Sequence, residues 1–120
     1  MPRVLLVEDD ETLAFGIATL LQLEGFAVNV LAEGRGVVGM VAHAQPDALV
    51  IDVSLPDIDG VVVADAVRKG WPKLPIIFIT GHDVTGDEVR RRPRDARTVM
   101  LQKPFDIEQL IRAIEEKLRE

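Results

Sequence analysis

The chain has 120 residues, 48% of them hydrophobic, and carries a net charge of -6. The negative charge disfavours direct contact with nucleic-acid phosphates, and the lack of cysteine excludes disulfides, thiolate catalysis and cysteine-ligated zinc. Because the start lacks a signal-peptide pattern and the apolar runs are too short for a membrane span, we expect one soluble, cytoplasmic domain over residues 1–120.

The first part of the chain alternates between segments typical of strands and segments typical of helices. Residues 4–7 form an apolar run that predicts a strand buried on both faces, and Asp10 is placed to cap a helix that Gly25 ends. A second strand is expected over residues 26–31. The helix expected next, over residues 34–44, is weakened by three glycines.

The middle of the chain repeats this alternation around an acidic loop. The apolar run at residues 48–51 predicts a strand that ends at Asp52. Residues 55–60 are rich in Pro, Asp and Gly, a composition typical of a loop. A helix is expected to follow over residues 61–69.

The last part of the chain contains two more strands and two more helices. A fourth strand is expected over residues 75–79, a short helix over 83–92 and a fifth strand over 98–101. Asp106 and Gln109 predict a capping box for the final helix, whose apolar residues recur at helical spacing. Five successive strand–helix repeats predict an α/β fold with a parallel sheet and right-handed crossovers.

Polar side chains stand at the carboxyl ends of four of the expected strands. Glu8 and Asp9 follow the first strand, and Asp52 closes the third. Thr80 closes the fourth strand, and Lys103 follows the fifth. Because ligands of open parallel sheets bind beyond the carboxyl ends of the strands, we expect these side chains to share one crevice.

The residue types in this crevice suit phosphoryl transfer. Crowded carboxylates repel one another, and a hard cation such as Mg2+ relieves that repulsion. A carboxylate such as Asp52 can attack phosphorus as a nucleophile. The ammonium of Lys103 and the bound metal would neutralise the transferred charge, and the hydroxyl of Thr80 can donate to a phosphoryl oxygen.

These motifs together resemble the receiver domain of response regulators in two-component systems. The resemblance rests on the acidic opening at residues 4–10, the loop at 52–60, the pair Thr80-Gly81 and the run at 103–105. It covers the whole chain, with the motifs in order. It implies a flavodoxin-like (βα)5 three-layer sandwich whose parallel sheet has the strand order 2-1-3-4-5.

The resemblance also implies a role for each acid. Asp52 is the expected phosphoacceptor and a metal ligand. Asp9 is expected to hold the metal directly and Glu8 largely through water, with the backbone carbonyl of Ser54 as a further ligand. The expected metal is Mg2+, for which Mn2+ can substitute.

Thr80 and Lys103 are expected to contact the phosphoryl group, and the Lys103–Pro104 peptide bond is expected to be cis. The donor would be a phosphohistidine on a sensor histidine kinase or a phosphotransfer protein. Such a domain catalyses only its own phosphorylation and dephosphorylation. The signal would leave through the fourth helix, fifth strand and fifth helix to an output partner that the sequence does not name, and homodimerisation is left open.

Two departures from the family pattern concern this output face. Met100 stands where family members often carry an aromatic switch residue, and methionine can repack but cannot make the aromatic flip. The fourth helix is interrupted by Pro93 and crowded by the arginines of residues 90–97. We interpret these arginines as a solvated surface, because no aromatic residues interleave with them for base stacking.

Other functions remain as alternatives. Gly34, Gly36 and Gly39 match the G-x-G-x-x-G pattern of nucleotide-binding loops, although the neighbouring Glu33 would repel a pyrophosphate. A constitutive receiver-like docking scaffold is a second alternative. An aspartate-nucleophile phosphatase is disfavoured, because Ser54 occupies the position where such enzymes need a second acid.

Overall fold

The computed structural model describes residues 1–81 and 97–120. The helix predicted over residues 83–92 and most of the arginine-rich segment lie outside these residues. The described part of the chain forms a five-stranded parallel sheet with the order β2-β1-β3-β4-β5. The predicted fold class and strand order are therefore confirmed.

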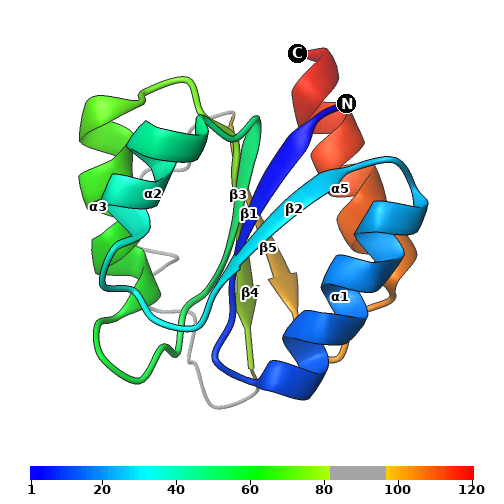
Figure 1. The fold of residues 1–120 in the computed structure, drawn as a ribbon, viewed down its shortest axis with the longest axis horizontal. Helices are drawn as coiled ribbons and strands as arrows, with labels where there is room; N and C mark the ends of the chain where they lie inside the picture. Colours follow the sequence, from blue (N-terminus) through cyan, green and yellow to red (C-terminus); the bar gives the residue numbers. More distant parts are fainter. Residues whose placement is uncertain (82–96) are drawn as a thin grey trace.

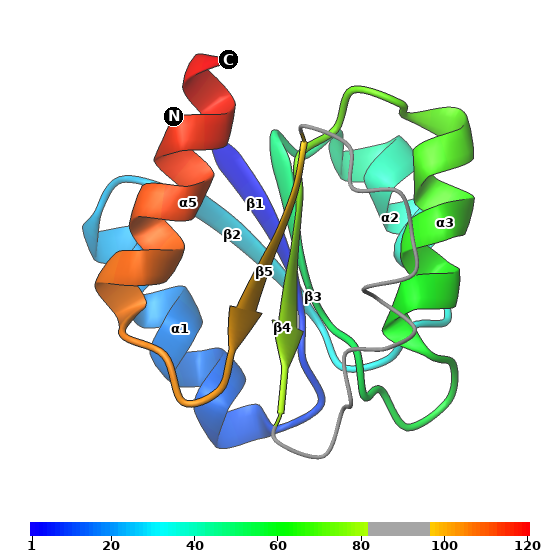
Figure 2. The ribbon, with the colours of Figure 1, turned by 180° about the vertical axis from the view of Figure 1, so that it is seen from behind.

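The described elements and the predicted ones correspond closely. Their bounds, in chain order, are β1 (Arg3–Val7), α1 (Glu11–Leu23), β2 (Ala27–Leu31), α2 (Val37–Ala44), β3 (Ala48–Asp52), α3 (Gly60–Gly70), β4 (Ile76–Thr80), β5 (Thr98–Gln102) and α5 (Ile107–Arg119). Helices α1 and α5 cover one face of the sheet, and α2 and α3 cover the other (Figures 1 and 2). Among the described residues, no helix combines the length and apolar composition that a membrane crossing requires.

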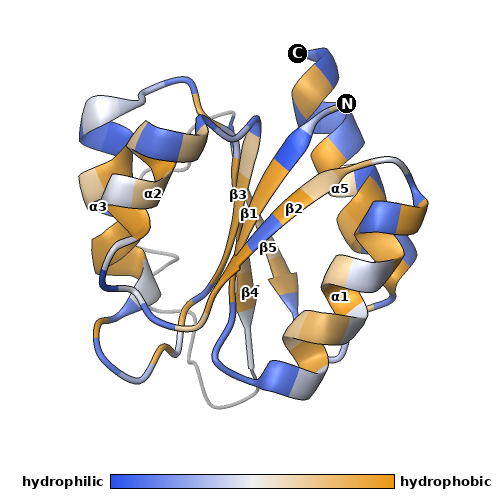
Figure 3. Ribbon diagram, in the orientation of Figure 1, coloured by the Kyte–Doolittle hydropathy of each residue, from blue (hydrophilic) through white to orange (hydrophobic). Residues whose placement is uncertain are grey.

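The core consists of two aliphatic layers, one on each face of the sheet (Figure 3). All five residues of β3 and all five of β4 are buried. A strand covered by helices on both faces has no side chain facing water, so its sequence is continuously apolar rather than alternating. This explains why β3 and β4 could be located from composition.

The helix termini that bear on the site are capped as the sequence predicts. The carboxylate of Asp10 accepts a hydrogen bond from the Leu13 N–H at 3.1 Å and so begins α1. At the start of α5, the backbone N–H of Asp106 donates to Gln109 Oε1 at 3.0 Å within the capping box. These caps satisfy backbone donors that the helices leave unpaired.

The expected start of the second helix at residue 34 was wrong, because α2 begins at Val37. Gly36 has a φ angle of 88°, in the left-handed region, so the right-handed helix cannot extend back through it. The residues between β2 and α2 form a loop instead. We call residues 32–36 the glycine loop.

Candidate functional site

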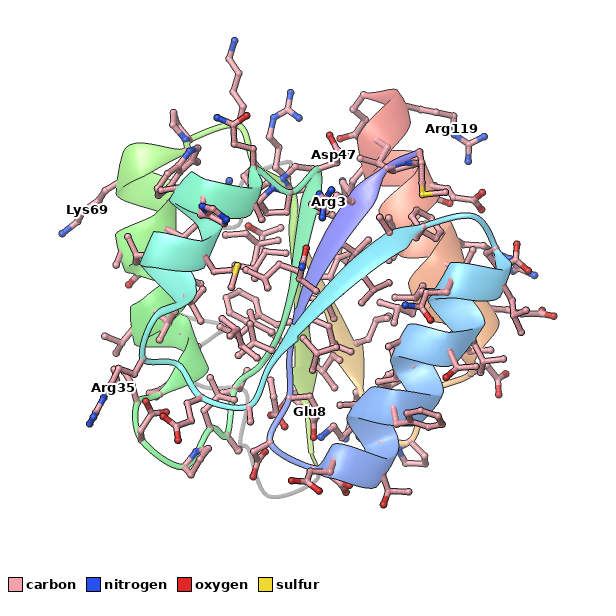
Figure 4. The ribbon with its side chains drawn as sticks, viewed as in Figure 1. Arg3, Glu8, Arg35, Asp47, Lys69 and Arg119 are labelled. Carbon is pink, nitrogen blue, oxygen red and sulfur yellow. The ribbon has the colours of Figure 1, made fainter. Side chains whose placement is uncertain are left out.

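The predicted site residues lie together at the carboxyl end of the sheet. Sheet register pairs Asp52 of β3 with Ile79 of β4, next to Thr80, while Glu8 and Lys103 directly follow β1 and β5. In Figure 4, Glu8 marks this end of the molecule, whereas Arg3 and Asp47 lie at the opposite end. The parallel sheet thus collects side chains that are distant in sequence.

Three carboxylates form a compact cluster at this end of the sheet. One oxygen each of Glu8, Asp9 and Asp52 lies within 4.8 Å of the others. Glu8 and Asp52 are almost fully buried, at 1% and 3% exposure, and Asp9 is exposed. Carboxylate oxygens this close together could hold a small divalent cation such as Mg2+, which prefers oxygen ligands.

Lys103 links two of these acids. Its Nζ atom lies 2.9 Å from Asp52 Oδ2 and 3.2 Å from Glu8 Oε1. The backbone N–H of Lys103 donates to the Thr80 carbonyl oxygen at 2.7 Å, which holds the segment after β5 against β4. The Lys103–Pro104 peptide bond is cis, as the family resemblance implied.

The remaining predicted residues surround the acceptor carboxylate. The Ser54 N–H donates to Asp52 Oδ1 at 2.8 Å, so both oxygens of Asp52 are hydrogen-bonded. Thr80 is buried, and its hydroxyl donates a long, 3.4 Å hydrogen bond to the Gly81 carbonyl. All the predicted positions are therefore brought to one place, with Thr80 at its edge.

The site holds its acids in different protonation states. Burial is the largest cause that raises the pKa of Glu8 to about 7, followed by the hydrogen bond and the charge of Asp52. The charge and hydrogen bond of Lys103 act in the opposite direction and lower it. Burial also opposes ionisation of Asp52, but hydrogen bonds from Glu8, the Ser54 N–H and Lys103 outweigh it and lower the pKa of Asp52. Partial burial likewise opposes the charge of Lys103, but its two acidic partners raise its pKa. Near neutral pH, Asp52 is the ionised carboxylate and Glu8 is the one that takes up a proton.

Gly60 closes the loop that follows Asp52, a role that sequence reasoning did not assign. We call residues 53–59, between β3 and α3, the acceptor loop. The Gly60 N–H donates to the Val53 carbonyl at 2.9 Å, and a Cβ atom at Gly60 would lie only 2.1 Å from the Asp52 carbonyl oxygen. The Asp-Gly pair at the end of the loop was the available sequence signal.

Asp57, in the acceptor loop, also makes contacts that the sequence did not reveal. Its two carboxylate oxygens accept hydrogen bonds from the backbone N–H groups of Gly34 and Arg35, each at 2.8 Å. These are the donors that a nucleotide-binding glycine loop would offer to a pyrophosphate. Since a carboxylate of the chain already occupies them, and Gly39 lies inside α2, the nucleotide-binding alternative loses support.

Met100 lies on β5, half-buried, opposite Phe78 in the sheet register. It packs against the apolar layer that α2 and α3 cover. A thioether in this packed position can change rotamer, but it has no hydroxyl or ring to present at the surface.

Comparison with known proteins gives one consistent family. The family model described as the response regulator receiver domain matches residues 4–115. Response regulator MprA of Mycobacterium leprae is 34% identical over 117 residues, covering 98% of this chain and 51% of that protein. Transcriptional regulatory protein TrcR of Mycobacterium tuberculosis is also 34% identical over 117 residues, covering 98% of this chain and 45% of that protein. The chain spans about half the length of these curated relatives.

Solved structures agree with this comparison. A response regulator receiver protein from Sinorhizobium medicae superposes with a TM-score of 0.86 at 29% identity, covering 98% of this chain and 94% of that one. A CheY-like receiver domain protein from Methanospirillum hungatei has a TM-score of 0.89 at 24% identity, covering 99% and 94%. The second similarity concerns the fold only.

Proposed function

The chain belongs to the response regulator receiver domain family of two-component signalling, and we propose that Asp52 is its phosphoryl acceptor, working with Mg2+ bound by the acidic cluster. The observation that carries this proposal is the burial of Asp52 with both carboxylate oxygens hydrogen-bonded, one to the Ser54 N–H and the other to Lys103 Nζ. A carboxylate with a lowered pKa remains available as a nucleophile at neutral pH.

The proposed reaction transfers one phosphoryl group from a phosphohistidine to Asp52. A carboxylate oxygen forms the new O–P bond, the N–P bond breaks, and its electron pair stays on the departing imidazole nitrogen. The donor histidine belongs to a sensor histidine kinase or a phosphotransfer protein. The chain thus catalyses its own phosphorylation and dephosphorylation, and no other substrate is proposed.

Each side chain of the site has a proposed part in this transfer. Bound Mg2+, held by Asp9, Asp52, the Ser54 carbonyl and, through water, Glu8, would neutralise charge on the transferring oxygens. Lys103, now bonded to Asp52 and Glu8, is placed to turn toward the added phosphoryl oxygens.

The proposed switch begins at Thr80 and Lys103. Lys103 is the first residue of the segment between β5 and α5, and its backbone N–H donates a hydrogen bond to the Thr80 carbonyl. A shift of either residue would therefore displace that segment. Phosphorylation then biases an equilibrium between two arrangements of β5 and α5. The expected fourth helix, which would complete this face, lies outside the described residues. A cytoplasmic location and the output partner remain predictions.

A phosphate mimic tests the proposed switch. Beryllofluoride added with Mg2+ is expected to shift the amide NMR signals of Asp52, Thr80 and Lys103, because it occupies the place of the phosphoryl group. The shifts should require Mg2+ and vanish in Asp52→Ala. If the wild-type protein binds no beryllofluoride, the domain is a constitutive docking scaffold and the proposal fails.

The protonation of Glu8 predicts a pH dependence of Mg2+ binding. With a pKa of about 7, Glu8 carries a proton at pH 6 that the cation must displace, so the Mg2+ affinity should fall roughly tenfold from pH 8 to pH 6. Calorimetric titration at both pH values measures the effect. In Glu8→Gln the pH dependence should disappear, and an equal affinity of the wild type at both pH values would contradict the assignment.

Protonation of Glu8 also affects the stability of the metal-free protein. Here the dependence is reversed: Mg2+ affinity rises with pH, whereas the stability contributed by Glu8 falls. The folded pKa of Glu8, about 7, exceeds its ordinary value of 4.5, so its contribution to stability is present below 4.5 and is lost as the pH rises through 7. Mg2+ should therefore raise the melting temperature more at pH 8 than at pH 6. This thermal measurement supports the titration independently.

A further inference from the structure

The acceptor loop is held at both ends by backbone hydrogen bonds. The Val53 N–H donates to the Ile79 carbonyl of β4 at 2.9 Å, and the Gly60 N–H donates to the Val53 carbonyl at 2.9 Å. Between these anchors, Ser54 is exposed. Its N–H donates to Asp52 Oδ1 at 2.8 Å, and the orientation of its carbonyl, a proposed metal ligand, depends further on what holds the middle of the loop.

Asp57 holds that middle part. Both of its carboxylate oxygens are used, one by the Gly34 N–H and the other by the Arg35 N–H, each at 2.8 Å. The hydrogen bond from the Gly34 N–H is the largest cause and lowers the pKa of Asp57; burial opposes it, and the Arg35 N–H lowers the pKa further. The side chain is thus ionised at neutral pH, and its hydrogen bonds are charge-assisted.

Packing at Gly34 shows independently that the two loops form one interface. Gly34 is buried, and a Cβ atom there would lie 2.9 Å from Val63 Cγ2 of α3. The same atom would lie 3.4 Å from Leu55 Cδ1 and 3.4 Å from Ile58 Cβ, both in the acceptor loop. The glycine loop therefore rests directly on the acceptor loop where Asp57 binds it.

We propose that Asp57 is a positioning residue for phosphoryl acceptance, which fixes the acceptor loop against the glycine loop and so holds the Ser54 carbonyl and Asp52 ready for the metal. This inference rests on the proposed function. The hydrogen bonds of Asp57 go to the glycine loop, so it acts on the site through the backbone of the acceptor loop. An ordered loop need not lose conformational freedom when the cation binds, so the affinity for the cation is higher.

The test compares Asp57→Ala and Asp57→Asn with a matched control at the opposite end of the sheet. Asp57→Ala removes both hydrogen bonds, and Asp57→Asn keeps one acceptor oxygen. The control is Asp47→Ala, because Asp47 is also an exposed aspartate that accepts a backbone N–H, from Arg3 at 2.7 Å (Figure 4). Each variant is titrated with Mg2+ in the absence of any phosphodonor, and the Ser54 amide signal is followed by NMR.

We expect the Mg2+ dissociation constant to rise about tenfold in Asp57→Ala, with an intermediate rise in Asp57→Asn and no change in Asp47→Ala. The rate of phosphorylation by acetyl phosphate should then fall at low Mg2+ and recover at saturating Mg2+. A merely structural role would lower the melting temperature without this separation of affinity from maximal rate.

Wild-type Mg2+ affinity in folded Asp57→Ala would overturn the inference. If Asp57→Ala does not fold, the Asp57→Asn variant provides the test. An unchanged Mg2+ affinity in Asp57→Asn would then contradict the inference. Failure of the wild-type protein to accept a phosphoryl group would instead refute the proposed function. The Mg2+ titrations need no phosphodonor, so these two failures can be told apart.

Discussion

Asp52→Asn is expected to abolish phosphoryl acceptance, lowering its rate by roughly a thousandfold or more. The amide nitrogen and oxygen are poor nucleophiles, whereas the ionised carboxylate of Asp52 offers an oxygen lone pair beside Lys103. The measurement is the intact mass of the protein after incubation with acetyl phosphate and Mg2+. The wild type should gain the mass of one phosphoryl group and the variant should not.

Asp47→Asn provides the matched control for this prediction. It makes the same chemical change in an aspartate that lies at the amino end of the sheet, where it bonds to the Arg3 backbone (Figure 4). This variant should accept a phosphoryl group at the wild-type rate. If the wild type and Asp52→Asn gain the phosphoryl group equally, the acceptor is a residue other than Asp52.

Gly60→Ala is expected to destabilise the fold by about 3 kcal/mol or more, the upper part of the range for overpacking substitutions. The added methyl group would lie 2.1 Å from the Asp52 carbonyl oxygen and 2.9 Å from the Val53 Cα atom. These are backbone atoms of a buried strand end, so they cannot move aside as a flexible side chain would. Chemical denaturation of the variant and the wild type measures the difference in unfolding free energy.

Gly39→Ala is the control for this substitution. Gly39 lies within α2, and a Cβ atom there would meet nothing within 4 Å apart from its chain neighbours and the backbone of its own helix. Because alanine favours helix more than glycine does, this variant should be more stable by about 0.5–1 kcal/mol. If Gly60→Ala were as stable as the wild type, the close packing of α3 against Asp52 would be disproved.

The sheet and the place of the site could be predicted because both depend on simple patterns. Strands β3 and β4 are covered on both faces, so each reads as a nearly unbroken apolar run. Parallel order then brings the polar residues at the strand ends together, which predicts that Glu8 and Lys103 lie beside Asp52.

Contacts between loops could not be predicted in the same way. The hydrogen bonds from the glycine loop to Asp57 join segments that have no periodic pattern, and the loop contains a left-handed turn at Gly36. The same turn explains why α2 begins later than the spacing of its apolar residues suggests.

The protonation state of Glu8 could not be predicted from the sequence either. Its pKa depends on burial and on neighbouring groups rather than on residue type.

The most direct test of the central claim locates the phosphoryl group on the wild-type chain. After phosphorylation with Mg2+, borohydride reduces an aspartyl phosphate to homoserine, and mass spectrometry of the peptides identifies the converted residue. The account predicts homoserine at position 52, dependent on Mg2+ and on the phosphodonor. Conversion at Glu8, Asp9 or any other carboxylate, with Asp52 unchanged, would contradict it.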